Sequence, residues 1–300
     1  MSSSSGPAAS PAASPAAELM QVLDLEERGP DLYVGTTPSS PLQRIFGGQV
    51  AAQALTAAQA TVAAGRPVHS LHSYFLRPGD PNEEIRYVVE RIRDGRSFST
   101  RRVLAHQTRR GEQVAIFALT ADFPRPEPAA VTHSLPMPDV PPPDSIPTIQ
   151  EYARRHGRED DEHLELLGQA VDQRSLDDPF ARVPKKEPDT RSYGWFRVAG
   201  RLPDDPTIHA AALTFVTDLT LLGAGLARKG GWDDRYEGAS LDHAVWFHAP
   251  VRADEWFLYE TDSPAAAGAR ALNFGHIWSV DGTHVASVAQ EGLIRDVGGA

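Results

Sequence analysis

The sequence contains two related segments, one in each half of the chain. The first is His69–Pro78 and the second is Ala239–Pro250. Aligned on their prolines, they place Tyr74-Phe75 over Trp246-Phe247. In both halves a strongly patterned run of about fifty residues follows, with a turn and a final apolar strand. A module repeated once predicts two similar domains that face each other, with room for chemistry at their joint.

Each module is expected to contain one long helix followed by antiparallel strands. In the first module a helix opens at Phe46-Gly47-Gly48 and ends at Gly65, with small and apolar residues at helical spacing. In the second module the matching helix is expected from Pro206 to about Ala227. Strands are expected in the first module at 69–75, 85–94, 98–107 and 113–123, and the second repeats this order. An alanine-rich helix can lie close against a sheet, so the pattern predicts an α+β fold in which the sheet wraps the helix.

Composition shifts divide the chain into four parts. Residues 1–18 are mostly Ser, Ala and Pro and are expected to form a disordered tail. Residues 19–123 form the N-terminal domain and 169–300 the C-terminal domain. Between them, 124–168 combines a linker with a charged surface helix. Nine prolines between Pro124 and Pro147 are too many for packed structure.

Charge and composition exclude several classes of function. A formal net charge of −11 argues against nucleic acid and anionic membranes as partners, because both attract basic surfaces. The chain has no cysteine, which rules out disulfides, a thiolate nucleophile and cysteine-bound metal. The N-terminus does not resemble a signal peptide, and no apolar stretch approaches the roughly 20 residues of a membrane helix. We therefore expect a soluble, cytoplasmic protein without membrane insertion.

Asp218 is the first candidate for chemistry. It is the only acid between Asp205 and Asp233, and its neighbours at helical spacing are largely apolar. A carboxylate in that row is either buried at considerable cost or placed at the mouth of a pocket. The structural alternatives are pairing with an arginine on the sheet, or an exposed helix position.

Ser240 and Gln290 are the next candidates. Ser240 precedes His243, which suggests a hydrolase triad, but no Gly-x-Ser-x-Gly elbow surrounds it. Strand alternation also puts His243 on the opposite face, so Ser240 is interpreted as a hydroxyl that holds a water or caps the backbone. In the last strand Gln290 shares a face with Ala286 and Val288, and is either a structural hydrogen-bonding group or part of a site.

Two further positions could contact a ligand. Gly48 belongs to a glycine pair at a helix start, where backbone N–H groups can approach an anion. His72 lies on a strand with Ser70 and Tyr74, either in the core or in a pocket. The eleven histidines show no metal-binding motif, and Gly47-Gly48 is not a dinucleotide fingerprint. Neither a metal nor another cofactor is expected.

Several blocks together resemble the acyl-CoA thioesterase II family, which comprises bacterial and peroxisomal double hotdog enzymes. They cover most of the chain from Leu19 to Arg295 and occur in the order of the family's pattern. The matching blocks are 44–55, 69–80 and 93–103 in the first module, and 217–219, 240–248 and 290–295 in the second.

The resemblance implies two tandem hotdog domains, each an antiparallel sheet wrapped round a central helix, with the sheets joined and the helices side by side. It implies hydrolysis of fatty acyl-CoA to fatty acid and coenzyme A, a reaction of lipid metabolism. Asp218, Ser240 and Gln290 match the residues that bind and activate the hydrolytic water in this family, with Asp218 as general base. Ser240 replaces the threonine common in bacterial members, and the segment after Asp218 lacks their Asn-Phe-Leu-Pro type of sequence.

Acyl-CoA is the expected partner, and a homodimer or homotetramer the expected assembly, because hotdog sheets leave edges and apolar surfaces to cover. Gly48 and His72 could shape the oxyanion or acyl side of a pocket shared by both modules. The stretch Arg93–Arg102 is a candidate for the coenzyme A phosphates. Two alternatives remain: a non-catalytic acyl-CoA binding or sensing protein, and a hotdog dehydratase or hydratase, which requires a His/Asp pair.

Overall fold

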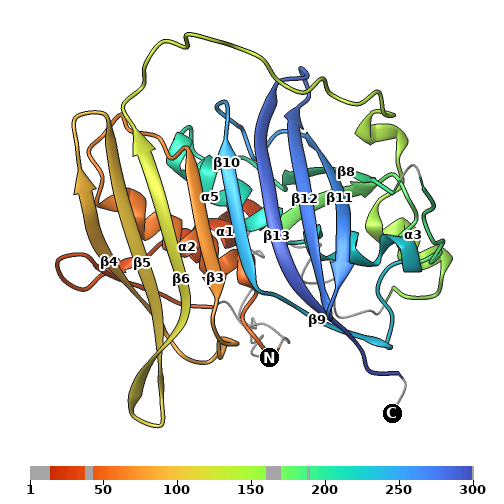
Figure 1. Cartoon of the computed structure of the whole chain (residues 1–300), viewed down its shortest axis with the longest axis horizontal. Coiled ribbons are helices and arrows are strands. Elements are labelled where there is room, and N and C mark those ends of the chain that lie inside the picture. Colours follow the sequence, from red (N-terminus) through yellow and green to blue (C-terminus); the bar gives the residue numbers. More distant parts are fainter. Residues whose placement is uncertain (1–13, 38–42, 160–169, 188–189, 299–300) are drawn as a thin grey trace, which may run out of the picture.

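The computed structural model describes residues 14–37, 43–159, 170–187 and 190–298 (Figure 1). Within them one antiparallel sheet of thirteen strands runs through both modules, in the order β1-β2-β4-β5-β6-β3-β10-β13-β12-β11-β8-β7, with β9 also paired to β13. The strands are β1 Glu26–Glu27, β2 Leu32–Gly35, β3 Ser70–Phe75, β4 Ile85–Asp94, β5 Phe98–Arg109, β6 Glu112–Pro124, β7 Val171–Ser175, β8 Ser192–Val198, β9 Tyr236–Ser240, β10 Asp242–Phe247, β11 Phe257–Ala267, β12 Arg270–Ser279 and β13 His284–Asp296.

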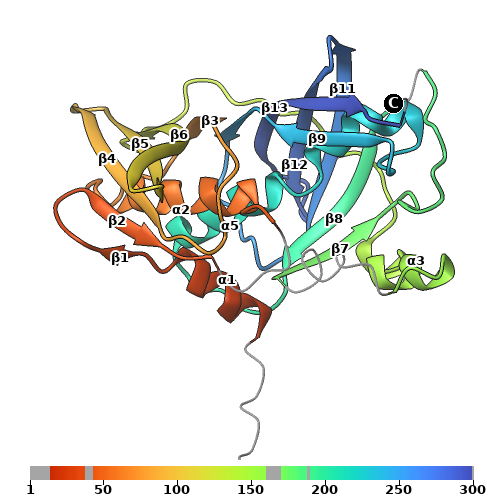
Figure 2. The same ribbon diagram turned by 90° about the horizontal axis from the view of Figure 1, so that it is seen from below.

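The long helices lie side by side on the concave face of this sheet (Figure 2). They are α2 Gly47–Ala60 in the first module and α5 Pro206–Thr217 in the second, joined by α1 Pro15–Leu23. The remaining helices are α3 Ile149–Arg155 and the 3-10 helices η1 Pro143–Ser145 and η2 Leu221–Lys229. The predicted α+β architecture, a sheet wrapped round a helix in each module, is confirmed.

The two modules join where β3 pairs with β10. Leu71 lies opposite Val245 in this pairing, and both side chains are fully buried. At this seam the two related segments of the sequence run antiparallel to each other. The two modules are therefore related by an approximate two-fold axis. The prediction of one continuous sheet with neighbouring helices is therefore confirmed.

Small residues allow the helices to approach each other closely. A Cβ atom added at Gly48 would lie 2.5 Å from the carbonyl oxygen of Phe215. Ala51, Ala54 and Ala58 are completely buried in the same helix. The alanine-rich composition of α2 is thus explained by a helix with neighbours on nearly every side, because any larger side chain would hold the helix away from the sheet.

Three boundaries differ from the sequence prediction. Helix α1 begins directly after its cap residue Ser14, and Ala16 is only 3% exposed. The expected domain boundary at residue 18 is therefore wrong. Residues 1–13 lie outside the described part. The helix expected to reach Ala227 ends at Thr217 and continues as η2. The charged helix is described only as α3, since 160–169 lie outside the described residues.

The proline-rich linker packs more closely than its composition suggested. It crosses from β6 to the second module along the top of the sheet in Figure 1. Trp278 Nε1 donates to the carbonyl of Leu135 at 3.1 Å, and Trp195 Nε1 donates to that of Pro141 at 2.9 Å. Ile146 is buried against both tryptophans. The indole N–H groups donate to linker carbonyls that have no neighbouring strand. An extended proline-rich segment can therefore still bind firmly to the sheet.

Pro206–Lys229 is long and apolar enough to cross a membrane by length and composition alone. The prediction that no stretch has this character is therefore wrong. In the structure this stretch is α5 with η2, and 61% of its most apolar window is buried inside the protein. Its apolar composition is explained by a position between the sheet and a second helix.

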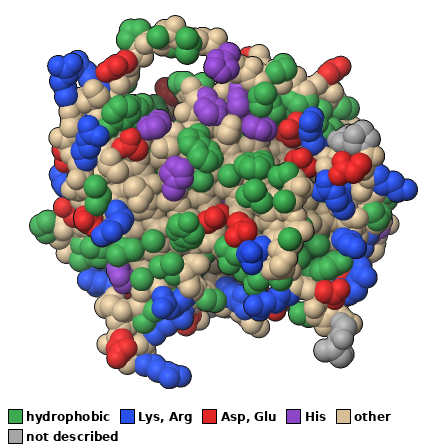
Figure 3. All heavy atoms as spheres, viewed as in Figure 1, with side chains coloured by type: hydrophobic (Ala, Val, Ile, Leu, Met, Phe, Trp, Pro, Cys, Tyr) green, Lys and Arg blue, Asp and Glu red, His purple; other side chains and the backbone are tan. Residues whose placement is uncertain are grey.

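The outer face of the sheet carries no helix among the described residues. Hydrophobic side chains and histidines gather on this face (Figure 3). Its exposed aromatic residues include Tyr74, Phe274 and Trp246, at 62%, 42% and 36%. Exposed aromatic residues gathered on one sheet face are typical of a surface that another molecule covers.

Candidate active site

A cavity of about 1810 Å³ opens at the joint of the two modules. From the first module it is lined by residues at the start of α2 and the end of β3, including Phe46, Gly47 and Phe75. From the second it is lined by Asp218, Ser240 and residues of β8, β11 and η2. Both halves of the chain are needed to form its wall.

Asp218 lies where α5 ends and is its C-cap residue. Its carboxylate is 8% exposed and accepts three hydrogen bonds. Gln290 Nε2 donates to Oδ1 at 2.5 Å, Ser240 Oγ donates to the same oxygen at 3.2 Å, and the backbone N–H of Gly48 supplies the third. The three residues that the sequence singled out, Asp218, Ser240 and Gln290, therefore meet at one carboxylate oxygen.

Burial raises the pKa of Asp218 from 3.8 to about 6, because desolvation disfavours the charged carboxylate. The hydrogen bonds from Gln290, Ser240 and Gly48 act in the opposite direction and lower this pKa. The balance leaves a carboxylate that is mostly ionised at neutral pH and still able to accept a proton. That is the character of a general base.

The chain between β9 and β10 contains one extra residue. Ser240 pairs with Gly292 and Ala244 with Ala289, so four steps on this chain face three steps on β13. Such a bulge shifts the alternation of side chains, and the prediction that Ser240 and His243 face opposite ways is wrong. Both side chains contact Gln290 Nε2, at 3.1 Å and 3.2 Å.

Gln290 faces inward, as the alternation of β13 predicted, and is fully buried with Val288. Its Oε1 has no hydrogen-bond partner among the described residues. Its Nε2 contacts His243 Nδ1, whose ring reaches the Thr217 hydroxyl through Nε2 at 2.9 Å. Sequence reasoning did not place His243 and Thr217 in this network. Thr217 directly precedes Asp218 in the chain, and His243 follows Ser240 by three residues.

The glycine pair at the start of α2 is packed against the acid. A Cβ atom added at Gly47 would lie 2.6 Å from Asp218 Oδ2, and the N–H of Gly48 bonds to the same carboxylate. The close backbone approach predicted for this pair is present. Its partner within the protein is the carboxylate of Asp218, and Gly47 also lines the cavity.

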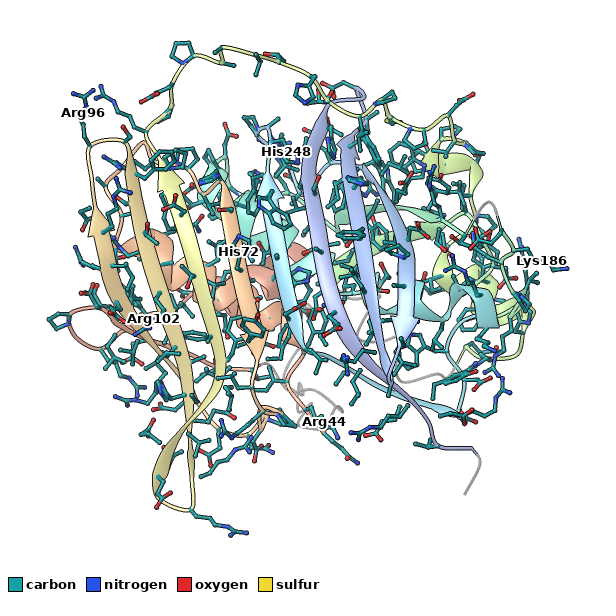
Figure 4. All side chains as sticks on the ribbon, viewed as in Figure 1. Arg44, His72, Arg96, Arg102, Lys186 and His248 are labelled. Carbon is teal, nitrogen blue, oxygen red and sulfur yellow. The ribbon has the colours of Figure 1, made fainter. Side chains whose placement is uncertain are left out.

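His72 and the arginine stretch lie away from the cavity. His72 is exposed on the outer face of β3, where its ring packs against Trp246 at 5.2 Å between centroids (Figure 4). The prediction that it contributes to the pocket is not supported, because alternation turns Leu71 and Ser73 inward instead. In the stretch 93–102, Arg101 is buried against Asp94 and Arg102 pairs with Glu90, so neither reaches the cavity.

No group of three or more histidine, aspartate and glutamate side chains in the described ranges is arranged to hold a metal ion. The polar side chains that meet at Asp218 are its own carboxylate, the amide of Gln290 and the hydroxyl of Ser240. These groups can accept, donate and position protons, which suits chemistry in which a water molecule is the nucleophile.

Comparisons with known proteins match both modules of the chain. The model of the acyl-CoA thioesterase N-terminal domain matches residues 36–124, and that of the C-terminal domain matches 137–294. Human acyl-coenzyme A thioesterase 8 is 37% identical over 285 residues, covering 91% of this chain and 88% of that protein. Acyl-CoA thioesterase 2 of Haemophilus influenzae is 33% identical, covering 92% and 96%.

Among solved structures, an acyl-CoA thioesterase II, TesB2, from Mycobacterium marinum superimposes with a TM-score of 0.77. It is 40% identical and covers 94% of this chain and all of that chain. A tesB protein of Mycobacterium avium superimposes with a TM-score of 0.76 at 31% identity, covering 93% and 99%. The similarity extends across both modules and their joint.

The burial of Asp218 predicts a stability penalty. Its pKa in the folded protein, about 6, exceeds the ordinary value of 3.8, so the folded state binds the proton more tightly and loses stability as pH rises between these values. Above pH 6 the penalty reaches about 3 kcal/mol. Asp218→Asn should therefore raise the free energy of unfolding by about 2–3 kcal/mol at pH 7.5, with a smaller gain near pH 4.

Urea denaturation of both proteins at the two pH values measures this difference. Asp139→Asn, at an exposed linker position, is the matched control and should change stability little at either pH. A variant at Asp218 that is equally or less stable at pH 7.5 would contradict the buried, strained carboxylate.

Proposed function

The chain belongs to the acyl-CoA thioesterase family and hydrolyses acyl-CoA thioesters, and we propose that it does so by direct attack of a water molecule activated by Asp218. The observation that carries this mechanism is the convergence of Ser240 and Gln290 on Asp218 Oδ1. These groups come from β9, β13 and the end of α5; Asp218 and Ser240 line the cavity, and Gln290 is buried beside them.

The proposed reaction is a single displacement through a tetrahedral intermediate. Asp218 accepts a proton from water as the oxygen forms a bond to the thioester carbonyl carbon. The intermediate then collapses, the carbon–sulfur bond breaks, and the proton returns from Asp218 to the departing sulfur. Fatty acid and coenzyme A are the products. A pKa of about 6 suits both transfers, because the base is ionised at neutral pH and releases its proton readily.

The amino end of α2 supports charge on the carbonyl oxygen in this mechanism. Unpaired N–H groups at a helix start, with the helix dipole, stabilise a developing anion. The N–H of Gly48 is used by Asp218, which leaves Gly47, a cavity-lining residue, as the proposed donor. The Gly47 position tolerates no side chain, because a Cβ atom there would collide with Asp218.

The site favours water over serine as the nucleophile. The Ser240 hydroxyl donates to Asp218 and lies 3.1 Å from Gln290 Nε2, and the nearby imidazole of His243 contacts Gln290 instead. Ser240 therefore lacks the histidine base that activates a nucleophilic serine.

The dehydratase alternative needs a histidine and an acid aimed at one substrate. His243 is fully buried behind Gln290 and is not among the residues that line the cavity, so this pair does not face the substrate. A non-catalytic acyl-CoA binding protein would not explain why a carboxylate is buried at Asp218 at a cost in stability.

Coenzyme A is an anion, and basic residues line the cavity at its periphery. We propose that its phosphates bind among Arg44, Arg77 and Arg182, since phosphate groups bind best to guanidinium forks. Arg44 is exposed near the lower end of the sheet in Figure 4. This set replaces the stretch Arg93–Arg102, which lies at the far edge of the first module.

We predict that Asp218→Asn loses at least 99% of turnover, about two orders of magnitude, as expected when a general base is removed. Binding should survive, because the amide preserves the shape of the site. Thiol release measures the first property, and calorimetry with a non-hydrolysable acyl-CoA ether measures the second. Asp234→Asn, at the exposed mouth of the cavity, is the control and should remain active. Near-normal kcat at Asp218→Asn would remove this residue from the mechanism.

The pH dependence should report the same group. With the pKa of Asp218 at about 6, kcat/KM should fall about tenfold per pH unit below that value and level off above it. Ser240→Ala removes a hydrogen bond that lowers this pKa, so its acid limb should move to higher pH. A wild-type profile that is flat from about pH 5 to 8 would show that another group is the base.

We also propose that the outer face of the sheet mediates a homodimer or homotetramer. Its exposed aromatic residues include Tyr74 and Phe274 (Figure 3). Light scattering should give a mass at least twice the 32.5 kDa of the chain, and Tyr74→Lys with Phe274→Lys should reduce it. Val131→Lys, at a still more exposed linker position, is the control. A mass near 32.5 kDa at micromolar concentration would contradict the assembly.

A further inference from the structure

A chain of hydrogen bonds leads from the end of α5 to the amide of Gln290. It begins at Thr217, whose hydroxyl donates to the carbonyl of Thr214 at 2.9 Å. The helix ends here, and the N–H of Asp218 bonds to Val216, so the hydroxyl takes the place of the usual backbone donor. The buried carbonyl of Thr214 requires a partner, which commits the single hydrogen of this hydroxyl.

The committed hydroxyl determines which nitrogen of His243 carries the proton. Thr217 Oγ1 lies 2.9 Å from His243 Nε2 and can only accept there, so Nε2 carries the hydrogen. In the neutral ring Nδ1 then presents a lone pair. Complete burial lowers the pKa of His243 to about 4, so the ring stays neutral wherever the enzyme works.

The lone pair on Nδ1 in turn determines the orientation of the Gln290 amide. Nδ1 lies 3.2 Å from Gln290 Nε2 and can accept an N–H, whereas it would repel Oε1. The second amide hydrogen points to Asp218 Oδ1 at 2.5 Å, beside Ser240 Oγ. A flipped amide would place Oε1 against the carboxylate, where two acceptors repel each other.

We propose that His243, held as its Nε2–H tautomer by Thr217, is a positioning residue that orients Gln290 so that its amide donates to Asp218. His243 does not touch the substrate; it acts through Gln290. The orientation also leaves Gln290 Oε1 without a hydrogen-bond partner among the described residues.

The other titratable group packed on this network is Tyr259 of β11. Its hydroxyl donates to the carbonyl of Thr217 at 3.1 Å, and burial raises its pKa well above the ordinary value. It stays neutral, so Asp218 is the group whose ionisation depends on the amide.

The first test is the tautomer of His243 in the full-length protein. Histidine labelled with ¹⁵N, assigned by comparison with His243→Asn, should show the proton on Nε2 and none on Nδ1 at pH 7. This measurement does not depend on catalysis, so it separates this inference from the proposed function on which it rests. A proton on Nδ1 would overturn it.

The second test compares two buried threonines of α5 that differ by one turn. Thr217→Val keeps the shape of the side chain but removes the acceptor for His243 Nε2. Its kcat/KM should fall about threefold at pH 6.5, recover substantially at pH 9, and show an acid limb moved upward by about one unit. KM should change less than kcat. Thr217→Ser should restore the wild-type profile.

Thr214→Val is the matched control, because the Thr214 hydroxyl bonds only to the carbonyl of Ala210 within the helix. It should leave the acid limb in place. An unchanged limb in Thr217→Val, or an equal loss of rate at every pH, would contradict the positioning role. If Thr217→Val does not fold, the pair His243→Asn and His243→Leu replaces it. Asparagine offers an acceptor where Nδ1 lies and should leave the acid limb of the pH profile in place. Leucine offers none and should move that limb to higher pH.

Discussion

The carboxylate of Asp218 is buried at the meeting point of both modules, and the fold provides what that burial requires. An unpaired buried charge would be unstable by several kcal/mol. Three donors offset this cost, and they come from α2, β9 and β13. The α2 donor belongs to the other module. The seam between β3 and β10 and the close approach of the helices at Gly48 are therefore conditions for an ionised base, as well as for stability.

The two modules bury different polar side chains in their cores. In the first module Gln53 is fully buried, and every polar atom of its amide has a partner. Its Nε2 donates to the carbonyls of Val22 and Thr36, and its Oε1 accepts from Tyr87 at 2.7 Å. The buried group at this position is an uncharged amide, and none of its polar atoms remains free. The second module keeps a buried acid and, in Gln290, an amide oxygen without a partner. The structure thus supports one active site per chain, whose wall both modules supply.

Periodicity predicted the parts of the site that lie within regular elements. The inward position of Gln290 follows from the alternation of β13, and the burial of Asp218 is one of the alternatives that its apolar helix row allowed. The placement of His243 could not be predicted, because a single extra residue between Ser240 and Ala244 reverses the alternation, and no local residue pattern marks it. The order of the linker was missed for a similar reason. Its prolines cannot form a strand, but two tryptophan donors from distant strands bind its carbonyls.

Opposing effects set the pKa of the base. Desolvation is the largest and disfavours the carboxylate. Its position at the carboxyl end of α5 adds to that effect, since the helix dipole is negative there. The amino end of α2 points the N–H of Gly48 at the same carboxylate and acts in the opposite direction. At the amino end of a single helix, the helix dipole would have lowered the pKa of Asp218 and made it a weaker base. Two helices meeting at opposite ends keep the carboxylate ionised near neutral pH and still basic enough to take a proton from water.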